Sequence, residues 1–115
     1  MEHLGLSAIL GVWSDLMSAY YGKASHGDAT EIYAYRFWSY NPLIDSPGGF
    51  KIGSEARSMA IRSRIEQGVQ SILDLLVYFQ SRMQCKVIID GEPLSGWHRR
   101  HWDFSHRAII KIEKA

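Results

Sequence analysis

The sequence predicts an α+β domain in which a small, mainly antiparallel sheet of about three to four strands carries two helices on one face, in the order α-β-α-β-β. Two observations predict this class. Apolar residues recur at helical spacing in two long stretches, and short stretches rich in β-branched and aromatic residues follow each of them. The 115 residues fit a single domain, 1–115, and 46% hydrophobic residues suffice for a core without disulfides.

The longest helical pattern covers residues 54–83, and we expect the rest of the chain to pack on it. Ser54 is the predicted N-cap, and Glu55 suits the positive end of the helix dipole. Such a helix is roughly 45 Å long, so its stripe could exceed what a small sheet covers and favour a homodimer. The stripe consists of Ile61, Ile65, Val69, Ile72, Leu76, Phe79 and Met83.

The first half of the chain predicts a helix followed by a strand. Apolar residues at helical spacing run through residues 6–20, and Gly22 is a natural C-terminal stop. Residues 31–40 are rich in tyrosine, phenylalanine and tryptophan, which favour a strand, and Asn41-Pro42 ends it. Residues 50–52 are expected to add a short edge strand before the long helix.

The C-terminal part predicts two strands that pair with each other. Residues 86–90 form a short apolar run closed by the turn signal Asp90-Gly91. Residues 106–113 alternate between apolar and polar side chains, as a half-buried strand does. We expect these strands to form an antiparallel pair, joined by an irregular connection over residues 92–105.

Composition and charge exclude several classes of protein. The net charge is only +1, which argues against a dedicated nucleic-acid coat, although residues 1–50 are acidic and residues 51–115 are basic. No stretch is long and apolar enough to span a membrane, and the N-terminus lacks the basic region of a signal peptide. The single Cys85 beside an apolar run suggests a buried side chain in a reducing compartment, so we expect a cytoplasmic protein.

Residues 97–104 are the most unusual stretch, with three aromatic, two histidine and two arginine side chains in eight positions. Arginine beside tryptophan is favoured at binding sites because its planar cation stacks on aromatic rings and bonds carboxylates or phosphates. In the structural alternative, the aromatic side chains only anchor this connection into the core. We predict no catalytic residue, metal or cofactor, and predict partner binding by Tyr33, Tyr35, Trp97, His98, Arg99, Arg100, His101, Trp102 and Asp103.

The motifs that usually mark an enzyme are absent from the sequence. Gly48-Gly49 is not followed by the Lys-Ser/Thr of a phosphate-binding loop, and no GxSxG elbow is present. His98 and His101 stand three residues apart, but zinc needs three or four converging ligands, and no cysteine pair or HExxH helix accompanies them. The sequence therefore favours other roles for these histidines over metal binding.

These observations favour a non-catalytic protein-binding module, in concrete form an inhibitor or immunity-type protein that neutralises a toxin or enzyme. Its partner would be another protein, with no role for a membrane, and acidic residues such as Asp28, Glu31 and Asp45 could meet a basic enzyme. One alternative is nucleic-acid binding by the basic and aromatic segment 97–111. Another is a small histidine-dependent hydrolase or nuclease that uses His98, His101 and Asp103.

Overall fold

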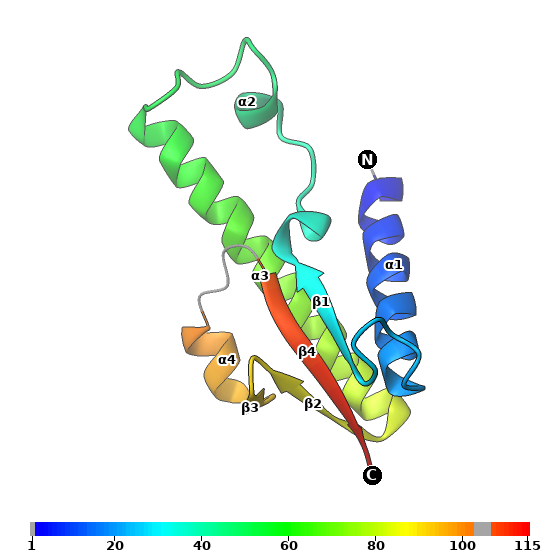
Figure 1. The fold of residues 1–115 in the computed structure, drawn as a ribbon. Coiled ribbons are helices and arrows are strands. Elements are labelled where there is room, and N and C mark those ends of the chain that lie inside the picture. The colour runs from blue at the N-terminus through cyan, green and yellow to red at the C-terminus, as the bar shows by residue number, and fades with distance from the viewer. Residues whose placement is uncertain (1, 103–106) are drawn as a thin grey trace.

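The computed structural model describes residues 2–102 and 107–115, with side chains from residue 6 onwards, and it confirms the α+β class (Figure 1). Its described strands form a four-stranded antiparallel sheet in the order β1-β4-β2-β3. The predicted pairing of the two C-terminal strands is confirmed, since β2 and β4 lie side by side at the centre of the sheet. The strands are β1 (Ala29–Tyr33), β2 (Cys85–Ile89), β3 (Glu92–Pro93) and β4 (Arg107–Lys114).

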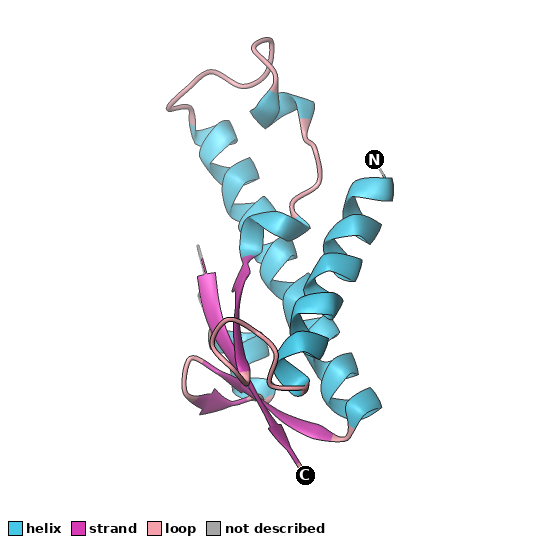
Figure 2. Ribbon diagram, turned by 45° about the vertical axis from the view of Figure 1, so that its right-hand side comes forward, coloured by secondary structure: helices cyan, strands magenta, loops and turns pink. Residues whose placement is uncertain are grey.

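The two long helices agree with the sequence pattern. Helix α1 spans Glu2–Tyr20 and helix α3 spans Glu55–Met83. The predicted N-cap of α3 is confirmed, because the Ser54 hydroxyl accepts a hydrogen bond from the Arg57 backbone N–H at 3.2 Å. Helix α1 contacts β1 and β4, whereas α3 contacts β2 (Figure 2).

The core lies between these helices and one face of the sheet. Along β4 the side chains alternate between buried and exposed, as the sequence predicts for a half-buried strand. Trp13 of α1 meets Phe79 of α3 edge to face, with ring centroids 4.9 Å apart. Cys85 is also buried, and that burial raises the pKa of its thiol. The largest fully buried side chains are Val12, Leu16, Ile32, Ile72, Leu73, Leu76, Phe79, Val87, Ile89 and Ile110.

The predicted strand over residues 31–40 is wrong after Tyr33. The chain turns there into a 3-10 helix, η1 (Ala34–Phe37), that lies against α3. Gly68 of α3 explains the turn: a Cβ atom at this position would lie 3.0 Å from the Trp38 ring and 3.2 Å from the Ala34 carbonyl oxygen. Close packing on this glycine therefore overrides the strand preference of the aromatic residues.

Other expectations for the connections also need correction. Residues 50–52 form no strand, and the preceding loop contains the short helix α2 (Pro42–Asp45), capped by the Asn41 side chain. The irregular connection predicted after β2 contains β3 and helix α4 (Gly96–His101). Position 106, where the last strand was predicted to begin, lies outside the described residues.

Helix α3 is longer than the sheet beneath it. Its 29 residues span about 44 Å, whereas the eight residues of β4 span about 26 Å. The molecule is accordingly elongated, with principal extents of 49 × 28 × 22 Å. The N-terminal ends of α1 and α3 diverge in both views, and the first turns of α3 project past the strands beside α2 (Figures 1 and 2). No helix in the described part of the chain is both long and apolar enough to cross a membrane.

Candidate partner-binding groove

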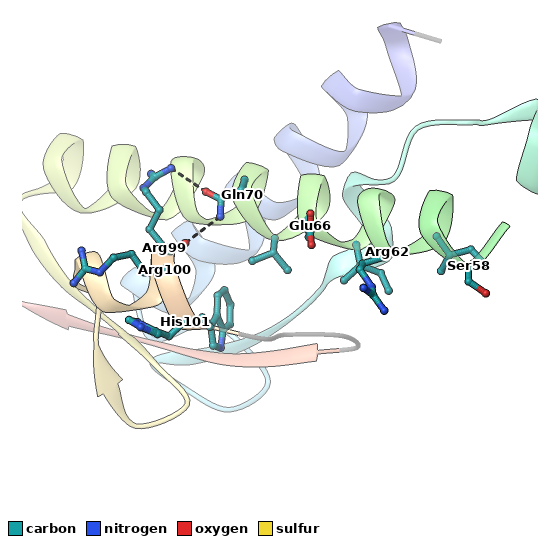
Figure 3. Close-up of a pocket in the computed structure, with 11 residues that line it drawn as sticks. Ser58, Arg62, Glu66, Gln70, Arg99, Arg100 and His101 are labelled. Atoms are coloured by element: carbon teal, nitrogen blue, oxygen red, sulfur yellow. Dashed lines mark hydrogen bonds between the residues drawn. The ribbon is translucent and has the colours of Figure 1, made fainter. Parts of the chain in front are cut away.

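A groove of about 700 Å³ lies between α4 and the N-terminal half of α3 (Figure 3). Helix α3 lines it from Ser58 to Gln70, and the end of α4 lines it from Arg99 onwards. We call this feature the α3–α4 groove. Its lining residues are Ser58, Ile61, Arg62, Ile65, Glu66, Val69, Gln70, Arg99, Arg100, His101 and Trp102.

Helix α4 begins at a capping box built by a histidine. The Ser95 hydroxyl accepts from the Trp97 backbone N–H at 3.3 Å, and Nδ1 of His98 accepts from the Ser95 backbone N–H at 3.1 Å. His98 is only 3% exposed, and the rings of Trp97 and Trp102 meet it edge-on. His98 therefore positions α4 and does not face the groove.

Three hydrogen bonds attach α4 to α3. The Arg99 guanidinium donates to Oε1 of Gln70 at 3.0 Å, and the Gln70 amide donates back to the Arg99 carbonyl oxygen at 3.3 Å (Figure 3). The guanidinium also donates to Oδ1 of Asp74 at 2.6 Å. The exposed Arg99–Asp74 ion pair by itself contributes only about 0.2–1 kcal/mol. Together, however, these bonds fix the position of α4 along α3 and so define the groove.

The groove combines an apolar floor with charged edges. Ile61, Ile65 and Val69 follow one another at intervals of four along α3 and form the floor, and the partly buried Trp102 adds an aromatic surface at the α4 end. Arg62 projects from α3 near one end, and Arg100 projects from α4 at the other (Figure 3). Among the described residues, no carboxylate forms an ion pair with either arginine.

The predicted partner-binding residues fall into separate groups. Four of the nine line the groove: Arg99, Arg100, His101 and Trp102. Trp97 is 51% exposed, and its ring stacks on that of His101 at a centroid distance of 5.5 Å. Asp103 lies outside the described residues.

Tyr33 and Tyr35 do not line the groove. They lie in β1 and η1, with ring centroids 5.5 Å apart. The Tyr33 hydroxyl donates to Glu31 at 2.7 Å, and this hydrogen bond raises the pKa of the phenol. Tyr35 is exposed, but the two rings belong to a surface distinct from the α3–α4 groove.

The helical pattern predicts that the apolar stripe of α3 could exceed what the sheet covers, a surplus that would favour a homodimer. The pattern does not locate the surplus, because Ile61, Ile65 and Val69 have the same spacing as the core residues that follow them. The lengths of the elements in the structure confirm that such a surplus exists. A helix of about 44 Å cannot be covered along its whole length by strands of five to eight residues. Part of the apolar stripe must therefore face something other than the sheet.

The geometry weakens the enzymatic and nucleic-acid alternatives. His98 is buried, and its Nδ1 accepts a hydrogen bond from the Ser95 backbone N–H. Arg107 and Lys111 lie on the exposed face of β4, at 3.2 Å and 3.9 Å from glutamate oxygens. Arg99 is likewise paired with a carboxylate.

The acidic residues proposed to meet a basic enzyme do not form one free patch. Asp45 of α2 accepts hydrogen bonds from Arg64 and from the Asn41 backbone N–H, and the Arg64 bond holds the pKa of Asp45 below its ordinary value. Glu31 of β1 pairs with Arg107. Two of the three carboxylates are thus already neutralised by arginines on different elements.

Comparisons with protein-family models, with curated proteins and with solved structures find no match to this chain. The functional argument therefore depends on the chain's own geometry.

Proposed function

We propose that this chain is a non-catalytic protein-binding module and that the α3–α4 groove binds a segment of another protein. The observation that carries the proposal is the apolar floor formed by Ile61, Ile65 and Val69. This floor lies beside α4, which hydrogen bonds hold in place on α3. Protein interfaces have an apolar core and are enriched in arginine and tryptophan, the side-chain types that this groove combines. A pre-formed groove also lowers the entropy cost of binding.

An inhibitor or immunity-type protein is the concrete version that we propose. A protein of this kind acts by occupying a surface of its partner and needs no reactive group of its own. The groove carries Arg62 and Arg100 without carboxylate partners among the described residues, so charge complementarity favours an acidic partner. This is opposite to the basic enzyme expected from the acidic N-terminal half of the sequence.

Affinity capture from the native lysate with matched variants tests this proposal. The test variant is Ile65→Asp in the groove floor, and the control is Ile109→Asp on the exposed face of β4. Circular dichroism would show whether Ile65→Asp still folds. If it does not, Ser58→Trp is the replacement test variant, because it adds a bulky side chain at an exposed end of the groove. We expect one stoichiometric protein to bind wild type and Ile109→Asp at moderate salt, and to be lost from the groove variants.

Two results would contradict the proposal. A partner that folded groove variants retain, and that Tyr35→Ala loses, would place the interface on β1 and η1. Nucleic acid that binds wild type and leaves as salt rises would favour the nucleic-acid alternative, because its phosphate contacts depend on counterion release.

A further inference from the structure

From the groove we infer the chemistry of its ligand: an amphipathic helix with acidic side chains toward both of its ends. This inference rests on the proposed protein-binding function. It follows from three properties of the groove: the absence of backbone partners along its floor, the spacing of its apolar residues and the placement of its two arginines.

The first property concerns the backbone of the ligand. The floor consists of side chains from α3, whose backbone N–H and C=O groups are bonded within the helix. An extended peptide would bring a row of backbone donors and acceptors against Ile61, Ile65 and Val69, which cannot bond them. A helix satisfies its own backbone and presents only side chains, so it suits this floor.

The second property is the periodicity of the floor. Ile61, Ile65 and Val69 are spaced by four residues and extend over about 12 Å of α3. A ligand helix lying along α3 matches this length with apolar side chains at positions i, i+4 and i+7. Trp102 then closes the α4 end of the groove with an aromatic surface.

The third property is the position of the charges. Arg62 lies near one end of the groove, and Arg100 belongs to α4, which is attached at Gln70 (Figure 3). The Arg100 side chain extends from α4 toward Gly96, on the far side of Gln70 from Arg62. Carboxylates toward the two ends of the ligand helix would therefore each meet one arginine.

Nucleic acid fits this groove less well than an acidic helix. Phosphates repeat along the whole of a strand, and binding them requires cations along the whole groove. Here the middle holds the isoleucine floor and the exposed Glu66, and Arg99 is already bonded to Asp74. A helix can avoid Glu66, because it places its own charges only where its sequence specifies them.

Fluorescence anisotropy with three labelled synthetic peptides of about 16 residues tests the inference. The first carries leucine at positions i, i+4 and i+7 and glutamates near both ends of the helix, beside the leucine face. The second replaces those glutamates with lysines, and the third scrambles the first. We expect the acidic helix to bind wild type at least about tenfold more tightly than the other two, a difference of about 1.4 kcal/mol.

The protein variants make the test specific for the groove. Arg62→Glu combined with Arg100→Glu should weaken the acidic peptide about tenfold and strengthen the lysine peptide. Arg82→Glu makes the same kind of charge change at an exposed position of α3 outside the groove and should leave both affinities unchanged. Circular dichroism would confirm that all variants fold.

Equal binding of the acidic and lysine peptides, no binding of the acidic peptide, or equal weakening by Arg82→Glu would overturn the inference. Tighter binding of a short single-stranded oligonucleotide would overturn it in favour of nucleic acid. The proposed function fails separately, when folded groove variants still capture the cellular partner. If they lose that partner while the acidic peptide does not bind, the groove proposal stands and only the ligand chemistry is wrong.

Discussion

The two halves of α3 carry the same apolar spacing but face different surroundings. In the C-terminal half, Ile72, Leu76 and Phe79 are fully buried against α1 and the sheet. In the N-terminal half, Ile61 and Ile65 are only partly buried and form the floor of the groove. The spacing of apolar residues therefore determines which side of a helix faces inward, whereas the length of the sheet determines how much of that side is buried.

Removing apolar volume from each half should separate their roles most clearly. Leu76→Ala leaves a cavity in the core and should lower the free energy of unfolding by about 2–5 kcal/mol. Ile61→Ala lies at the groove and should cost less than about 1.5 kcal/mol, because its side chain is already partly in solvent. Urea denaturation measures both, and equal losses would show that the two halves are packed alike.

Loss of the capping box of α4 should lower the free energy of unfolding less, and its effect should be confined to α4. His98→Ala removes the acceptor for the Ser95 N–H and should cost about 1–2 kcal/mol, with faster amide exchange in residues 96–101. His98→Gln keeps an acceptor at the same helical position and should restore most of the loss. An equal loss in both variants would mean that His98 acts through packing alone.

Gly68, at the junction of the two halves, should resist substitution. Gly68→Ala would bring a Cβ atom to 3.0 Å from the Trp38 ring, and the resulting strain of about 1–3 kcal/mol should exceed the helix-propensity gain of about 1 kcal/mol. Gly11→Ala in α1 is the matched control, because its new Cβ meets only the flexible end of Arg36. Thermal unfolding should therefore show a net loss of about 1 kcal/mol for Gly68→Ala and a smaller one for Gly11→Ala.

The smallest expected effect is the loss, at low pH, of the stability contributed by the hydrogen bond between Asp45 and Arg64 near the N-terminal end of α3. The Arg64 hydrogen bond lowers the pKa of Asp45 from its ordinary value of 3.8 in the folded state. The carboxylate therefore stabilises the fold above that value, and the contribution disappears as pH falls through the lower folded pKa. The difference in unfolding free energy between wild type and Asp45→Asn should shrink between about pH 5 and pH 3, and a constant difference would exclude this pair as its source.

Local patterns predicted much of the fold. The limits of α3, its Ser54 cap and the alternating burial of β4 follow from periodicity and capping preferences within short stretches. The end of β1 at Tyr33 could not be predicted in this way. It depends on Trp38 packing against Gly68, which lies thirty residues further along the chain.

The candidate site was predicted only on its α4 side. Arginine and tryptophan in residues 97–102 predicted binding from their types alone. The burial of His98 could not be predicted in this way, because it occupies the capping position where glutamate or glutamine is usual. On the α3 side, the length of the helix indicated surplus apolar surface, but which residues of the stripe the sheet leaves accessible depends on the tertiary packing. Tyr33 and Tyr35 remain predicted partner-binding residues outside the groove.

Hydroxyl-radical footprinting of the free and partner-bound protein tests the central claim most directly. We expect the partner to protect Ile61, Ile65 and Trp102, which line the groove. Ile109 on the sheet and Met59 on α3 are exposed outside it and should react equally in both states. Protection confined to Tyr35 or Ile109, with the groove side chains unchanged, would contradict the claim that the α3–α4 groove is the binding surface.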